Sequence, residues 1–144
     1  MSVDNKSFNW DAIPVTTVSS ADAAAGAQTT AITVPAGQRY QVISCGQTIV
    51  CSAAAANRIA NLYISMDGTN LEYSGPNLLT VTASQTKWVS QMAMSLITTA
   101  STQNGMHMPL IEIPAGGTIR FYWTALDAAD NLGVFRIMVK VAPA

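Results

Sequence analysis

Hydrophobic and polar residues alternate along most of the chain from residue 29 onward. Ile32 and Val34, and again Ile119, Phe121 and Trp123, are separated by single intervening residues. A period of two places successive side chains on opposite faces of an extended strand, so each strand is expected to bury one face. No stretch has a convincing helical period. The pattern therefore predicts a β-protein.

Turn signals interrupt these strands at short intervals. Asp67-Gly68 is typical of a hairpin turn, SGPN at residues 74–77 of a second turn, and TTASTQNG at residues 98–105 of a loop. About eight antiparallel strands with such connections predict a β-sandwich, with a jelly roll as the leading topology. The strands expected are the runs containing Ile32 and Val34, Tyr40 and Val42, Leu62 to Met66, LLTVT at 78–82, Trp88 to Leu96, MPLIEI at 108–113, Ile119 to Trp123, and Phe135 to Val141.

A chain of 144 residues is long enough for one domain with a core of its own. We expect the sandwich at residues 29–144 and an N-terminal arm and loop at 1–28. Residues 19–28, SSADAAAGAQ, have no apolar face and indicate a loop or a single helical turn. Phe8 and Trp10 stand in a polar segment, which predicts either a frayed terminus or an arm anchored on a neighbouring subunit.

The tripeptide Pro-Ala-Gly occurs twice, at residues 35–37 and 114–116, each time before an alternating run. Proline presets φ for the first corner of a type I turn, and the glycine can take the left-handed conformation of a G1 bulge. Phosphate-binding loops need several glycines leading into a helix, whereas both copies lead into a strand. The repeat predicts a structural corner used twice.

Charge is scarce, since Asp, Glu, Lys and Arg make up 10% of the residues, against 49% hydrophobic residues. Charged residues are depleted at the centres of protein interfaces, so this surface favours a permanent oligomer or assembly. A neutral, Ser/Thr-rich exterior also suits a stable secreted β-protein. The net charge is −1 and the seven basic residues are scattered, which argues against nucleic-acid binding.

The sequence has neither the signature of a signal peptide nor an apolar run long enough for a membrane span, so we expect no export signal and no membrane anchor. Cys45 and Cys51 lie in what looks like one strand, about 20 Å apart at strand spacing. That separation is too large for a disulfide, so we expect free, buried thiols, in agreement with a reducing cytosol.

Candidates for catalysis or metal binding are few, and we expect neither an enzyme nor a cofactor. His107 is the single histidine, and the chain has no G-x-S-x-G motif to accompany it. Asp127, Asp130 and Asn131 could supply oxygen ligands to Ca²⁺, but such residues also form Asx turns, and the spacing lacks a dense ligand pattern. Asp67, like Glu72, is expected to be a turn and surface residue.

Aromatic side chains are the more promising binding groups, because their faces can stack on sugar rings. Trp123 shares the apolar parity of its strand and is expected in the core, as Ile119 and Phe121 are. Tyr63 and Tyr122 have the opposite parity, so we expect them on the surface or at a subunit contact. Tyr73 and Trp88 are further candidates for stacking.

The segment PLIEIPAGGTIRFYW, with LGVFRIMVKV after it, resembles the two closing strands of trimeric jelly-roll domains of the tumour necrosis factor and C1q-like kind. The run NLYISMDGTNLEYSG is similar to strand-hairpin segments of phage virion proteins. The resemblance implies a homotrimer and a capsid decoration or cement protein of a tailed phage, made in the host cytoplasm and bound to the major capsid protein on the virion surface.

This resemblance leads to two functional hypotheses. In the first, the trimer is held by Tyr122, Val134 and Met138, and Phe8 and Trp10 contact the shell. Binding only to the assembled shell would stabilise it by mass action. In the alternative, the chain is a phage fibre or tail-tip domain, or a lectin-like domain, that binds a host glycan or receptor through exposed aromatic residues such as Tyr63.

Overall fold

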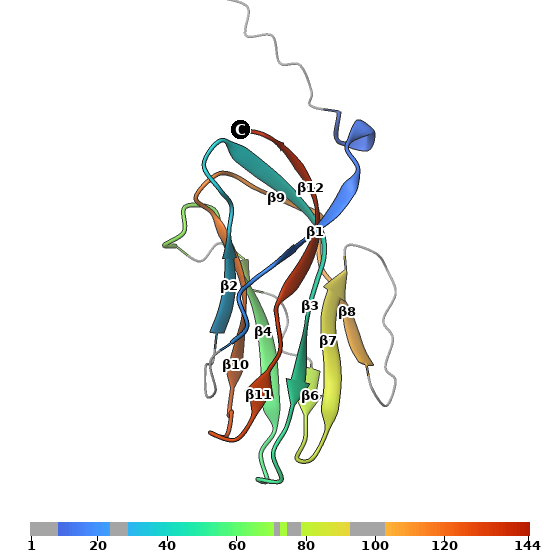
Figure 1. Cartoon of the computed structure of the whole chain (residues 1–144), viewed down its shortest axis with the longest axis vertical. Coiled ribbons are helices and arrows are strands. Elements are labelled where there is room, and N and C mark those ends of the chain that lie inside the picture. Colours follow the sequence, from blue (N-terminus) through green and yellow to red (C-terminus); the bar gives the residue numbers. More distant parts are fainter. Residues whose placement is uncertain (1–8, 24–28, 71–72, 75–78, 93–102) are drawn as a thin grey trace, which may run out of the picture.

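The computed structural model describes residues 9–23, 29–70, 73–74, 79–92 and 103–144. These residues form two packed β-sheets, which confirms the predicted all-β sandwich (Figure 1). Within them, no helix has the length and apolar character needed to cross a membrane. The elements are η1 (Trp10–Ala12), β1 (Val15–Ser19), β2 (Thr29–Thr33), β3 (Gln38–Val50), β4 (Arg58–Ser65), β5 (Tyr73–Ser74), β6 (Leu79–Val81), β7 (Thr86–Met92), β8 (Gln103–His107), β9 (Ile111–Ile113), β10 (Thr118–Thr124), β11 (Asn131–Leu132) and β12 (Arg136–Pro143).

The larger sheet has the order β1-β12-β3-β7-β8, with β9 and β11 also paired to β3. The smaller sheet has the order β2-β10-β4-β5, with β6 also paired to β4. The described residues thus form twelve strands rather than about eight, because β5, β6, β9 and β11 are short pieces of two or three residues. Pairing is antiparallel throughout, except that β8 runs parallel to β7.

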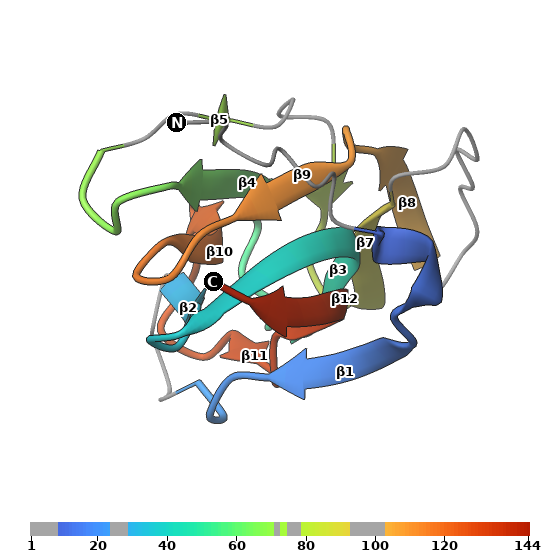
Figure 2. The same cartoon turned by 90° about the horizontal axis from the view of Figure 1, so that it is seen from above.

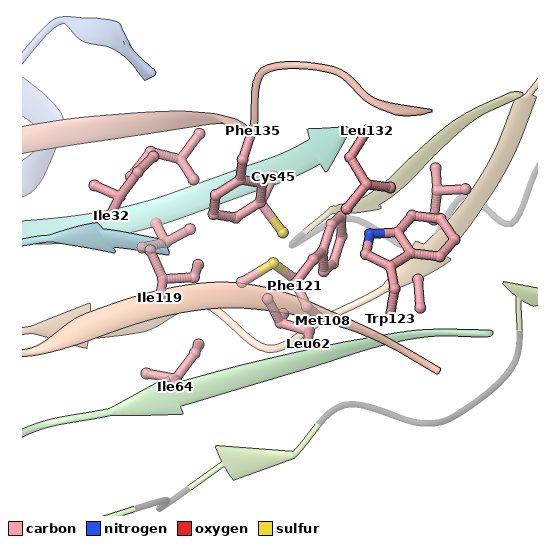
Figure 3. Packing of buried hydrophobic residues seen from close by; sticks show 14 of the residues in the cluster. Ile32, Cys45, Leu62, Ile64, Met108, Ile119, Phe121, Trp123, Leu132 and Phe135 are labelled. Atoms are coloured by element: carbon pink, nitrogen blue, oxygen red, sulfur yellow. The ribbon is translucent and has the colours of Figure 1, made fainter. Parts of the chain in front are cut away.

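The core lies between the sheets and follows the predicted parity of β10 and β12 (Figure 3). Ile119, Phe121 and Trp123 are fully buried, and the rings of Phe121 and Phe135 lie 5.1 Å apart. The indole N–H of Trp123 donates to Gln47 Oε1 at 2.9 Å, so the one polar atom of this buried ring is satisfied. The inward assignment of Trp123 is confirmed.

A β-bulge in β3 explains how this long strand keeps its apolar side chains inside. Val139 pairs with Val42 and Met138 with Ser44, which leaves Ile43 as the extra residue. The inward positions therefore change from even numbers before the bulge, Tyr40 and Val42, to odd numbers after it, Cys45, Gln47 and Ile49.

The two Pro-Ala-Gly corners lie side by side. The Val34 N–H donates to Gly117 O, and the Gly116 N–H donates to Val34 O, both at 2.9 Å. Gly37 and Gly116 have φ of +76° and +83°, as the left-handed prediction requires. The predicted turn type is wrong, however. Pro35 O accepts from Gln38 N–H, and Pro114 O from Gly117 N–H, so each proline occupies the first position of a turn whose third residue is glycine, as in type II.

Two expectations about the ends of elements are also corrected. The predicted arm and loop at residues 1–28 contain β1, which pairs with β12 over its whole length and belongs to the larger sheet. The predicted loop at 98–105 overlaps β8, which starts at Gln103. Pairing with β12 stabilises β1, and parallel pairing with β7 stabilises β8, although neither segment has a hydrophobic pattern strong enough to indicate a strand.

Candidate functional site

A cluster of two tyrosines and one arginine lies on the outer face of the smaller sheet, and we call it the tyrosine surface: Tyr63, Arg120 and Tyr122. Arg120 is directly opposite Tyr63 in the pairing of β10 with β4, and its guanidinium lies 5.7 Å from the Tyr63 ring centre. The two tyrosine rings are 5.9 Å apart and tilted by 42°. The predicted outward direction of Tyr63 and Tyr122 is confirmed, since both are half-buried on this face.

A small pocket of about 60 Å³ opens beside the tyrosine surface. Tyr63, Arg120 and the hydroxyl residues Ser65, Thr69 and Thr118 line it, together with Gly68. Arg120 is exposed and makes no hydrogen bond or ion pair to any described residue. The pocket therefore offers guanidinium N–H donors, hydroxyl groups and the aromatic ring of Tyr63 to a ligand.

Asp67, the residue before Gly68 of the pocket lining, organises the turn after β4. Its carboxylate accepts hydrogen bonds from the backbone N–H groups of Asn70 and Thr69 and from the Asn70 side chain. These bonds hold the pKa of Asp67 well below its ordinary value. The hairpin predicted at Asp67-Gly68 is confirmed, because β4 pairs antiparallel with β5.

The outer face of the larger sheet carries a more apolar feature, a hollow of about 350 Å³ that we call the apolar hollow. Trp88 lies across Gly46 so closely that a Cβ on that glycine would fall 2.2 Å from the indole ring. Met138 is 46% exposed at the other side of the hollow, and Arg136 is the one charged residue of its lining. The lining consists of Thr17, Ser44, Cys45, Gly46, Trp88, Ser90, Arg136, Ile137 and Met138.

The N-terminal segment contacts the upper part of the same sheet. The guanidinium of Arg39 lies 5.5 Å from the Trp10 ring centre, and Lys140 Nζ donates to the Trp10 carbonyl at 2.8 Å. Trp10 is half-buried by these contacts. Phe8, its predicted partner in shell contact, lies outside the described residues.

The predicted interface residues do not form one patch. Tyr63 and Tyr122 lie on the outer face of the smaller sheet, whereas Met138 points outward from the larger sheet on the opposite side of the sandwich. Val134 is half-buried just before β12. The sequence indicated which side chains point outward but not which of the two sheets carries them.

The acidic residues considered for Ca²⁺ serve the fold instead. Asp130 is buried and forms a two-point ion pair with buried Arg58, with Nε–Oδ2 2.8 Å and Nη2–Oδ1 3.0 Å. It also accepts the Ser52 and Asp127 backbone N–H groups at 2.7 and 2.8 Å. Burial raises the pKa of Asp130, but these hydrogen bonds outweigh it and lower the pKa to about 2. Among the described residues, no three His, Cys, Asp or Glu side chains are grouped to hold a metal ion.

Cys45 and Cys51 are free and buried, as predicted. Burial raises the pKa of the Cys45 thiol to about 12, against the effect of a hydrogen bond from the Gln91 backbone, so this thiol stays protonated. His107 lies in β8, where only its backbone is described, as is that of Tyr73 in β5, and Glu72 lies outside the described residues.

Strand β1 and the packing of Trp88 against Gly46 are the features that the sequence did not predict. Trp88 was a candidate for stacking, and it is half-buried on the outer face of β7, where Val89 and Gln91 are the buried residues. Gly46 in the middle of a strand was a usable signal, because an interior glycine often marks close approach of another group. The β-branched run VTTVS at residues 15–19 was a signal for β1.

Comparison with known proteins adds no family to this description: no protein-family model matches the chain, and no curated protein matches it.

Proposed function

We propose that the chain is a virus structural protein, a capsid decoration protein that binds the outside of the assembled shell as a homotrimer and stabilises it. The observation that carries this proposal is the apolar hollow on an open sheet face, with Met138 46% and Val15 45% exposed beside it. Exposed apolar area of this kind is typical of protein contact sites. We assign the hollow to contact with a second copy, because its single charge, Arg136, leaves few like charges to repel.

The strand order supports a jelly roll as the fold of this subunit. Taking β1, β2, β3, β4, β5, β7, β10 and β12 as its eight strands, one sheet has the order β1-β12-β3-β7 and the other β2-β10-β4-β5. The chain crosses between the sheets at most of these connections, as expected for two Greek keys wound into two sheets. We propose that β6, β8, β9 and β11 are additions to that plan.

Stabilisation of the shell would follow from mass action. A subunit that binds assembled capsid but not free capsid protein lowers the free energy of the assembled state by an amount set by its occupancy. The second surface needed for this, facing the major capsid protein, would be supplied by the N-terminal segment around Trp10 or by the tyrosine surface.

The trimer is tested by light scattering after size exclusion, with Ser90→Glu as the variant. Ser90 is half-buried in the lining of the apolar hollow, so a carboxylate there should abolish the trimer contact and leave the fold intact. Thr33→Glu, on the exposed face of the smaller sheet, is the matched control and should remain trimeric. A wild-type monomer at micromolar concentration, or a trimer in Ser90→Glu, would contradict the proposal.

The capsid role is tested by mixing the purified protein with phage capsids that lack their decoration protein. Saturable occupancy and a higher temperature of capsid disruption are expected. Absence of both would reject the decoration role.

The tyrosine surface favours a second candidate function, a fibre-tip or lectin-like domain that binds a host glycan. Sugar rings stack on aromatic faces, and their hydroxyls bind groups such as the Arg120 guanidinium and the hydroxyls of Thr69 and Thr118. A glycan array separates the two functions. Glycan binding that is lost in Tyr122→Ala, without any capsid binding, would favour the second.

A further inference from the structure

The strand β1 forms an open edge of the larger sheet. Figure 2 shows it as the outermost strand beside β12, and four of its five residues are exposed. A sheet edge presents a row of N–H and C=O groups that another strand can bind, so it is a potential site of association.

The hydrogen bond next to β1 tells which of its backbone groups face the open side. Ser20 N–H donates to Phe135 O at 2.8 Å, and the two residues are opposite each other in the register of β1 with β12. Antiparallel strands alternate between residues that bond to the partner and residues that point away from it. The backbones of Thr16 and Val18 therefore face β12, whereas those of Val15, Thr17 and Ser19 face outward.

Nothing in β1 protects this edge in the usual ways. The sequence VTTVS has no charged residue and no proline, and the pairing with β12 is regular, without a bulge. In the part of the chain that the structure describes, no hydrogen bond joins the outward backbone groups of Val15, Thr17 and Ser19 to another residue.

We infer that β1 pairs antiparallel with β1 of a second copy, about a two-fold axis at Thr17. This register places Thr17 opposite its own copy and Val15 opposite Ser19, so outward backbone groups meet outward backbone groups. No charge opposes a like charge in either pair. Exposed Met138 lies beside Thr17 on β12, and exposed Val15 faces Ser19 of the second copy, so both side chains flank the two-fold axis on one face of the joined sheet.

The contact differs from the trimer contact proposed above, because a two-fold contact is isologous and cannot close a three-fold ring. Ser90 lies on β7, on the far side of β3 and β12 from β1. Ser90→Glu therefore changes the hollow and leaves the edge intact. Thr17 offers its backbone to the edge and its side chain to the lining of the hollow, so Thr17→Val, which changes the side chain and keeps the N–H, separates the two effects of Thr17→Pro.

Amide hydrogen exchange on the wild-type protein tests the inference directly. The amides of Thr16 and Val18 should be protected at every concentration, since they face β12. Those of Val15, Thr17 and Ser19 should exchange about tenfold or more slowly at high concentration than after dilution to monomer. Equal, fast exchange of these three amides at all concentrations would overturn the inference.

Light scattering with variants gives the second test. Thr17→Pro removes one N–H from each copy at the central pair and should weaken the two-fold contact at least tenfold. The fold should be kept, because an edge strand tolerates proline where its N–H faces outward. Thr17→Val keeps the N–H and should associate like wild type. A dimer that survives in Thr17→Pro rejects the edge contact. Loss of the dimer in Thr17→Pro but not in Ser90→Glu supports the edge contact and rejects the trimer. If the wild-type protein is a trimer and Thr17→Pro is the same trimer, the edge contact is rejected and the trimer is supported.

Discussion

Asp130 illustrates how a residue's role depends on partners distant in sequence. As part of ALDAADNLG it could belong to a Ca²⁺ loop or an Asx turn. In the fold it lies against Arg58, 72 positions away, and both side chains are almost completely buried. A buried carboxylate with an arginine and two backbone donors has few lone pairs left for a metal ion. The pair joins the start of β4 to the loop after β10.

Replacing Asp130 with asparagine should lower the free energy of unfolding by about 3–5 kcal/mol at neutral pH, because Arg58 would remain buried without its counter-charge. Asp127→Asn is the control. Asp127 is only half-buried and accepts from Ala129 N–H and Ser52 Oγ, so the loss should stay below about 1 kcal/mol. Urea denaturation measures both. Equal losses in the two variants would show that the ion pair has no special role.

The pH dependence follows from the lowered pKa of Asp130. A carboxyl group with a pKa near 2 when folded and 3.8 when unfolded stabilises the fold above about pH 4, and this contribution is lost as pH falls toward 2. The difference in free energy of unfolding between wild type and Asp130→Asn should therefore shrink over that range. A difference that is constant from pH 7 to pH 2 would contradict this assignment.

At the scale of elements, the two Pro-Ala-Gly corners share a turn but differ at the next residue, Gln38 in the first and Gly117 in the second. A Cβ on Gly117 would lie 2.5 Å from Ile113 Cγ2, 2.9 Å from Ser65 O and 3.1 Å from Met66 O. The second corner is therefore pressed against the end of β4, and the first is not. The extra glycine in PAGG is a consequence of packing between elements rather than of the turn itself.

Gly117→Ala should consequently destabilise the protein by about 1–3 kcal/mol through overpacking. Gln38→Ala, at the equivalent position of the first corner, should change stability by no more than about 0.5 kcal/mol. Thermal and urea unfolding of the two variants measure the contrast. If Gly117→Ala were as stable as Gln38→Ala, the close packing of the second corner against β4 would be wrong.

At the scale of the whole molecule, charged residues are scarce and the two outer faces of the sandwich differ in chemistry. One face offers an apolar hollow and a neutral edge strand, and the other offers Tyr63, Arg120 and Tyr122. In the assembly that we propose, self-association uses the larger sheet, and the smaller sheet stays open for another partner.

The mass of the oligomer should therefore be insensitive to salt. Raising NaCl from about 0.1 to 1 M reduces the screening length from roughly 10 to 3 Å, which weakens exposed ion pairs but not apolar burial or strand pairing. Light scattering at the two salt concentrations should give the same mass. Dissociation at high salt would mean that ion pairs, such as contacts of Arg136 or Arg120, hold the copies together.

The alternation of apolar and polar residues was sufficient to determine a β-sandwich and the inward side of β10 and β12, because a strand has a period of two. The turn preferences of proline and glycine were sufficient to indicate the corner role of both Pro-Ala-Gly copies. Only the tertiary structure decided the rest. The bulge at Ile43, the position of Trp88 over Gly46 and the Arg58–Asp130 pair each depend on a strand or loop far away in sequence. The same reason separates Met138 from Tyr122, since parity tells inside from outside but not which sheet a strand joins.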